Sequence, residues 1–170
     1  MGSVSLRRAR YRVRQFTHGL RPFLSPAEIE AVRPYLSPSE RSLFLAAEGR
    51  DRRHSFDLFA ELQAVGASEA ELVAALLHDV GKGRLLTWHR VVFVLLNAVA
   101  PRLGRRLEAE HGRGWRRALW RLRHHAALGA ALLEVAGSAP RVIELVRGHT
   151  APPPEDDPQL ARLIEFDDRL

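Results

Sequence analysis

The stretch His78-Asp79-Val80-Gly81-Lys82 is the most informative in this chain, because it sets two metal-binding side chains beside a glycine. It closes the apolar run of residues 72–77. Ser68 precedes that run and Glu71 follows three residues later, which is the spacing of a helix-capping box. Gly81 lies where a helix commonly ends in a left-handed glycine. We therefore expect a buried helix that presents an imidazole and a carboxylate at its end.

His78 and Asp79 carry the donor atoms that divalent metals bind. Imidazole nitrogen and carboxylate oxygen suit Mn, Fe, Co, Ni and Zn ions, and carboxylates also bind Mg. A His-Asp dipeptide can also simply decorate a helix end, so the metal hypothesis depends on the other histidines and on a late aspartate. The 170-residue chain has no cysteine, which excludes disulfides and thiolate metal sites.

His54 is the first further candidate ligand. It shares a helix face with Leu58 and Leu62, because these residues follow one another at intervals of four. A histidine on an apolar face can be a buried structural residue. However, His54 lies 24 residues before His78, which is about one helix, a turn and a second helix. An antiparallel pair of helices would bring the two imidazoles to the same end.

The segments Arg53-His54-Ser55 and His78-Asp79-Val80-Gly81-Lys82 resemble the HD-domain superfamily of metal-dependent phosphohydrolases. The resemblance covers residues 50–170. It implies an all-α fold, an HD-domain helical bundle at 50–170 preceded by an N-terminal helical extension at 1–49. It also implies a function, the metal-dependent hydrolysis of a nucleotide or another phosphoester.

Two later segments extend this resemblance. His125 is followed four residues later by Gly129, as in the third-histidine segment of the HD-GYP branch, and a glycine there lets a neighbouring element approach closely. The last helix places Asp168 where the family has its final aspartate. After His149 the chain continues with residues 150–154, Thr-Ala-Pro-Pro-Pro, and lacks the Gly-Tyr-Pro motif. The resemblance thus favours a general HD hydrolase over a cyclic di-GMP phosphodiesterase.

The resemblance implies a set of ligands for one or two divalent ions: His54, His78, Asp79, His125, His149 and Asp168. Asp79 would bridge the two ions, with His125 and His149 completing the second position. Such ions would lower the pKa of a bound water and orient a phosphoester. Lys82, the only lysine in the chain, would meet the phosphate, so Asp79 and Lys82 are the candidate catalytic residues. Four histidines match no position of the pattern: His18, His89, His111 and His124.

Three other functions stay open. A non-catalytic HD module would bind a nucleotide or a partner, and a di-iron HD oxygenase would use the same ligands for oxidation. A basic nucleic-acid-binding protein would fit the net charge of +6. However, 25 of the 26 basic residues are arginine, a bias that a GC-rich genome produces without selection for binding. We therefore expect a small-molecule substrate and no nucleic-acid partner.

Local signals predict the remaining helices. Ser25-Pro26 and Ser37-Pro38 each begin a helix, with serine as the cap and proline at the first position. Residues 4–20 are predicted to form a basic helix, whose arginines we interpret as a solvated face; a basic arm for nucleic acid or an anionic membrane is the alternative. Residues 115–136 form a long helix with His125 near its middle.

The run of residues 91–100 is the most apolar of the chain. It is too short to cross a bilayer, which needs about 20 residues. We interpret it as a buried core helix, and a membrane-surface role with Trp88 at its head is the alternative. The basic segment at 5–10 is not followed by the apolar part of a signal peptide. We therefore expect a cytoplasmic protein without a transmembrane segment, and the oligomeric state stays open.

Overall fold

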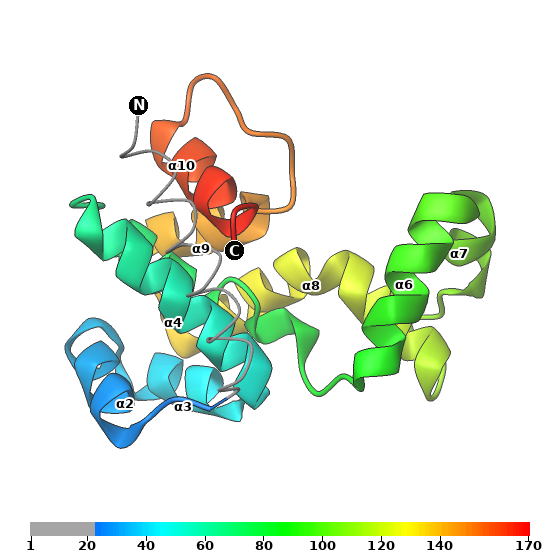
Figure 1. The fold of residues 1–170 in the computed structure, drawn as a ribbon, viewed down its shortest axis with the longest axis horizontal. Helices are drawn as coiled ribbons and strands as arrows, with labels where there is room; N and C mark the ends of the chain where they lie inside the picture. The colour runs from blue at the N-terminus through cyan, green and yellow to red at the C-terminus, as the bar shows by residue number, and fades with distance from the viewer. Residues whose placement is uncertain (1–22) are drawn as a thin grey trace, which may run out of the picture.

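The computed structural model describes residues 23–170, and the helix expected at 4–20 lies outside them. The described part consists of nine α-helices and two short 3-10 helices and contains no strand, so the predicted all-α fold is confirmed (Figure 1). The α-helices are α2 (Pro26–Val32), α3 (Pro38–Ala46), α4 (Gly49–Ala64), α5 (Glu69–Leu77), α6 (Thr87–Val99), α7 (Pro101–Leu107), α8 (Trp115–Ala136), α9 (Pro140–Gly148) and α10 (Pro158–Asp167). The 3-10 helices are η1 (Arg33–Tyr35) and η2 (Val80–Lys82).

Capping boxes begin α2, α3 and α5; the sequence predicted all three helix starts, and the box itself at α5. In each box a serine caps the helix and a glutamate three residues later bonds back to the serine backbone. At α5, Ser68 Oγ lies 2.7 Å from Glu71 Oε2, and the Ser68 backbone N–H donates to the same oxygen over 2.9 Å. These bonds satisfy N–H groups that a helix start leaves without partners.

The core is built around α5, which is buried from Glu71 to Leu77. It lies between α4 and α9, and their apolar faces form one cluster with it. Val32 and Phe44, from α2 and the following α3, belong to the same cluster. The helices before residue 49 therefore cover one side of the core that carries the His78–Lys82 segment.

Gly81 does not have the role that the sequence suggested. The expectation of a left-handed glycine at the helix end is wrong: α5 ends at Leu77, and Gly81 lies inside η2 without a positive φ. Instead, a Cβ at Gly81 would lie 2.0 Å from the His125 carbonyl oxygen and 2.5 Å from the Gly129 backbone nitrogen. The glycine is needed because η2 crosses α8 at backbone contact.

The apolar run at 91–100 is not buried, so the prediction of a core helix is wrong. No residue of α6 is buried. Figure 1 shows α6 beside α7 at one end of the molecule, away from α4, α9 and α10. The chain folds back at Pro101 into α7, a separate helix that the sequence analysis did not anticipate. Since α6 contacts only α7 and α8 extensively, one of its faces stays open.

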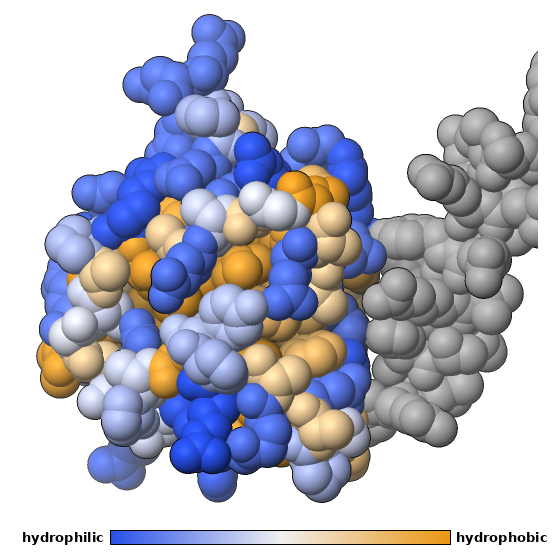
Figure 2. Space-filling view, turned by 90° about the vertical axis from the view of Figure 1, so that its left-hand side faces the viewer, coloured by the Kyte–Doolittle hydropathy of each residue, from blue (hydrophilic) through white to orange (hydrophobic). Residues whose placement is uncertain are grey.

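Figure 2 shows the opposite end of the molecule, where a central region of apolar side chains (orange and tan) is crossed and bordered by hydrophilic ones (blue). Among the described helices, none is long and apolar enough to cross a membrane.

Candidate metal centre

Six side chains with metal-binding atoms meet where five parts of the chain converge. They are His54 (α4), His78 and Asp79 (between α5 and η2), His125 (α8), His149 (end of α9) and Asp167 (α10). All five elements, α4, α5, α8, α9 and α10, contribute side chains to the same core cluster, so core packing holds the six side chains in place. Five of the six residues were predicted from the sequence.

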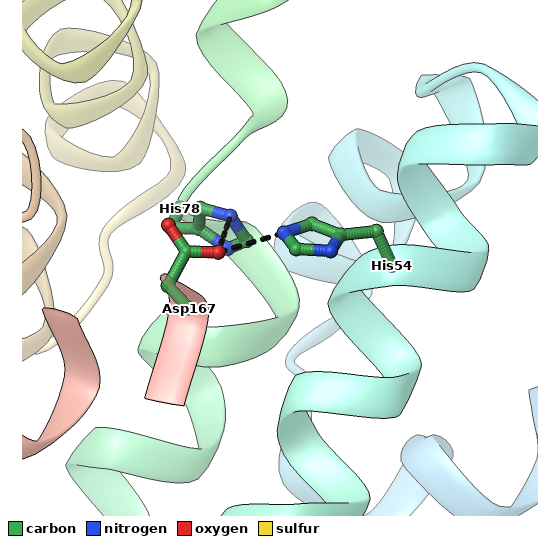
Figure 3. A group of neighbouring side chains, drawn as sticks. All are labelled: His54, His78 and Asp167. Atoms are coloured by element: carbon green, nitrogen blue, oxygen red, sulfur yellow. Dashed lines mark hydrogen bonds and ion pairs between the residues drawn. The ribbon is translucent and has the colours of Figure 1, made fainter. Parts of the chain in front are cut away.

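His54, His78 and Asp167 form the first half of the cluster (Figure 3). Asp167 Oδ1 lies 2.7 Å from His54 Nε2 and 3.6 Å from His78 Nε2. The antiparallel α4 and α5 bring the two imidazoles to the same end of the pair, with ring centroids 5.3 Å apart. One atom from each residue lies within 4.8 Å of the others, which is close enough for a single ion.

Asp79 joins this half to a second group of imidazoles. Its Oδ2 faces His78 Nε2 at 3.4 Å and Lys82 Nζ at 2.5 Å. Its Oδ1 faces His125 Nε2 at 3.4 Å and His149 Nε2 at 4.0 Å. The two oxygens of one buried carboxylate thus point to different histidines, which is the arrangement of a bridging ligand.

Three of the histidines are oriented by their own helices. The Nδ1 atoms of His78, His125 and His149 each lie within hydrogen-bond distance of the backbone carbonyl three residues earlier, at 2.9, 2.8 and 2.6 Å. A carbonyl only accepts, so each Nδ1 carries a proton and donates it. This leaves Nε2 of every ring as the atom that faces the centre, and such outer contacts are typical of histidines that bind metals.

Buried charges interact strongly at His78 and Asp79. Burial disfavours a charged His78, but the carboxylate of Asp79, helped by Asp167, outweighs burial and raises the pKa of His78 to about 9. Burial also favours a protonated Asp79, yet the positive charges of His78 and Lys82 hold its pKa well below the usual range. Without a metal, the centre therefore keeps a proton on His78 and a negative charge on Asp79.

The pKa values of His125 and His149 are shifted in the opposite direction to that of His78. Burial lowers the pKa of His125, and burial together with the positive charge of His78 lowers the pKa of His149 to about 3. Both rings are therefore neutral near pH 7. Their Nε2 atoms lie only 3.1 Å apart, and each presents a lone pair because Nδ1 holds the proton. Two facing lone pairs repel each other unless a cation lies close to both.

Two further atoms are poorly satisfied without a cation. Among the described side chains, His78 Nε2 and Asp79 Oδ1 are buried and have no hydrogen-bond partner. Leaving such groups unpaired costs about 1–3 kcal/mol each. A divalent ion bound by the imidazoles and carboxylates would satisfy both atoms, so the residues present fit a metal.

Asp168 is not part of the cluster, and its predicted place is taken by Asp167. Asp168 caps the end of α10 and is exposed, whereas the Asp167 side chain faces His54. The spacing of apolar residues in the sequence favours Asp167 over Asp168. Leu160, Leu163 and Ile164 define the inner face of α10, and Asp167 continues it at the next interval of three, one turn further on.

The histidines that match no position of the pattern lie elsewhere. His124 is exposed and stacks on Trp120 at 4.7 Å between ring centroids, so α8 turns His125 inward instead. His89 contacts Trp88, and His111 is exposed. His18 lies outside the described residues.

Other polar residues hold the segment after His78-Asp79 in place, and sequence reasoning did not find them. Arg121 donates to the carbonyls of Gly81 and Lys82 over 3.0 and 3.2 Å. Glu48 accepts from the Leu85 backbone N–H over 2.9 Å. These contacts join residues 37–40 positions apart in the chain, so no local pattern indicates them.

Comparison with known protein families, curated proteins and solved structures finds no match for this chain. The fold and the cluster therefore define the class of protein by themselves. It is an all-α protein with a buried histidine–aspartate centre suited to divalent metal ions.

Proposed function

We propose that this protein is a metal-dependent phosphohydrolase or phosphodiesterase that acts on a nucleotide or another small phosphoester. One observation carries the proposal: Asp79 divides its two oxygens between His78 and the His125–His149 pair, with Lys82 beside it. A carboxylate that faces two groups of histidines, with the ammonium of Lys82 beside it, suits the binding of metal and phosphate together. The resemblance to the HD superfamily in residues 50–170 supports the same reaction.

The residues divide into two ligand groups. His54, His78, Asp79 and Asp167 would hold one ion, and Asp79, His125 and His149 would hold a second. Divalent ions there would supply Lewis-acid activation of water and of a phosphoester oxygen. No serine or cysteine nucleophile is required.

Lys82 is the residue we assign to the substrate phosphate. A protonated amine has no lone pair for a metal, so Lys82 is not a ligand. It is the last residue of η2, and its side chain is largely buried against Asp79. A compact ammonium at this position would neutralise charge on a phosphoryl oxygen and hold the ester close to the ligand set.

Metal analysis followed by a substrate screen tests the proposal. The purified protein is expected to hold one or two divalent ions per chain. With Mn²⁺, it should hydrolyse at least one member of a panel of nucleotides, cyclic dinucleotides and p-nitrophenyl phosphate. Asp79→Asn should abolish both metal and turnover, while Asp168→Asn, its control, should keep both. Absence of metal at saturating concentration would reject the site.

The same assay separates the proposal from its alternatives. Bound iron with O₂ consumption and no phosphate release would indicate the di-iron oxygenase, because histidines with carboxylates also suit iron. Metal and nucleotide binding without turnover would indicate a regulatory module. Binding of nucleic acid with a steep salt dependence and no need for metal would indicate the basic binding protein.

A further inference from the structure

The outer face of α6 is a continuous apolar stripe. Val91, Leu95 and Val99 are 52%, 57% and 82% exposed, and they follow one another at intervals of four. Seven of the twelve exposed large hydrophobic residues of the described chain lie between positions 86 and 103: Leu86, Trp88, Val91, Val94, Leu95, Val99 and Leu103. An exposed apolar face of this length usually marks a binding surface.

The inner face of α6 is held firmly, so the outer stripe has a fixed position. Phe93 packs against a small buried cluster of Leu85, Ala118 and Leu122. Arg123 on α8 donates to Asn97 over 2.7 Å. It also pairs with Glu108 just after α7, at 2.7 Å. These contacts anchor both sides of the α6–α7 hairpin to α8.

Charge is strongly divided between this hairpin region and the rest of the described chain. Residues 84–123 contain ten arginines and two glutamates, a net charge of +8. The other described residues, 23–83 and 124–170, contain ten basic and eighteen acidic residues, a net charge of −8. Arg102, Arg105 and Arg106 in α7 are all exposed beside the apolar helix. The occupant of the stripe should therefore be negatively charged.

This charge argues against two occupants that the chain itself could supply. Residues 1–22 contain six arginines and no acidic residue, so they would be repelled from the hairpin. A second copy docked stripe to stripe would face a charge of the same sign. The occupant is better sought outside the chain.

We propose that the α6 stripe docks on the surface of a membrane that contains anionic lipids. The helix has 13 residues, too few to cross a bilayer, but it combines an apolar face, a tryptophan and neighbouring arginines as interfacial helices do. The apolar side chains would enter the headgroup boundary with Trp88 at one end, and the exposed arginines of α7 would contact lipid phosphates. Because this inference uses none of the metal ligands, it stands or falls separately from the proposed function.

Vesicle sedimentation with the full chain tests the docking. The protein should sediment with vesicles of phosphatidylglycerol and phosphatidylcholine and much less with vesicles of phosphatidylcholine alone. Val91→Glu/Leu95→Glu should weaken binding more than about tenfold, since it puts two charges into the apolar stripe. Leu132→Glu/Val135→Glu is the matched control: it makes the same charge change at exposed positions of α8 outside the hairpin and should bind like wild type. Circular dichroism and metal content should be the same in all three proteins.

A second pair of variants tests the arginines. Arg105→Gln/Arg106→Gln should weaken binding to the anionic vesicles about tenfold at low salt, and Arg141→Gln/Arg147→Gln, in the acidic part, should not. Equal binding of Val91→Glu/Leu95→Glu and wild type would overturn the proposal, as would equal binding to neutral and anionic vesicles. So would a wild-type dimer in sedimentation velocity that becomes monomeric in Val91→Glu/Leu95→Glu, because the stripe would then join two copies.

Discussion

Lys82 Nζ lies 2.5 Å from Asp79 Oδ2, so the one lysine of the chain contacts the most buried carboxylate of the centre. The same oxygen lies 3.4 Å from His78 Nε2. Lys82 is therefore neither a solvated loop residue nor independent of the ligands. A metal bound through Asp79 would weaken this ion pair, and Lys82 would then be available to a second anion, which we take to be the substrate phosphate.

Substitution of Lys82 should separate catalysis from metal binding. Lys82→Ala is expected to keep its metal, because the lysine competes with the metal for Asp79 and is not a ligand. It should lower kcat/KM about 10- to 1,000-fold, through loss of a charge-assisted contact in the transition state. Lys82→Arg should restore only part of the rate, since a planar guanidinium does not replace a compact ammonium.

Arg84→Ala is the control for this experiment, because Arg84 is exposed in the same loop. It should retain wild-type kcat/KM. Wild-type turnover by Lys82→Ala on the true substrate would show that the lysine has no part in the reaction.

A pair of neighbouring aspartates tests which one belongs to the centre. Asp167→Asn should weaken metal binding at least about tenfold, because it removes the negative charge of the carboxylate whose Oδ1 lies 2.7 Å from His54 Nε2. Asp168→Asn changes the same charge one residue further on, at an exposed position, and should bind metal like wild type. Isothermal titration with Mn²⁺ measures both. The reverse result would restore Asp168 as the ligand and reject the present geometry.

Metal binding should depend on pH through His78. The pKa of His78 is raised to about 9, so below that pH a metal must displace the proton from this ring. Affinity is therefore expected to rise about tenfold per pH unit between pH 7.5 and pH 9 and then to level off. His125 and His149 are already neutral in this range and add no proton. A competition titration with a chelator of known protonation measures the effect, and a flat profile from pH 7.5 to 9 would contradict it.

Gly81 should be more important for stability than its neighbour across the contact, Gly129. A Cβ at Gly81 would overlap backbone atoms of α8, which cannot move aside, so Gly81→Ala should cost about 3 kcal/mol or more in the free energy of unfolding. A Cβ at Gly129 would lie 3.3 Å from Val146 Cγ1 and no closer than 3.5 Å to any backbone atom outside α8, so only small shifts are needed. Gly129→Ala should therefore cost less. Urea unfolding of the metal-free proteins compares the two, and equal stabilities would argue against the backbone contact.

The features that could be predicted from this sequence depend on interactions between residues close together in the chain. Capping depends on residues a few positions apart, so Ser25, Ser37 and Ser68 indicated three helix starts correctly. His54 and His78 could be brought together because helix length and direction fix which ends meet. The all-α fold could be predicted because apolar residues recur along the chain at helical intervals.

The features that were missed depend on distant partners. The directions of the Asp167 and Asp168 side chains differ by about 100° around the axis of α10. Which of the two faces the centre depends on where α10 meets α4, and no residue near them in the sequence specifies that contact. Similarly, the apolar composition of α6 predicts that one of its faces is covered. It does not show which surface covers that face. The helix predicted at 91–100 therefore exists, as part of α6 at Thr87–Val99, but the predicted buried environment is wrong.

The division of charge described above gives the described part of the chain, residues 23–170, a large electric dipole. Residues 84–123, with +8, gather toward the α6–α7 end in Figure 1, and the parts with −8 lie toward the other. An electric field exerts a torque on such a dipole, so near a negatively charged surface it would turn before it touched. The protein would thus be oriented before it contacts the surface. Added salt screens the field over a shorter distance, so this orientation would be lost as the salt concentration rises.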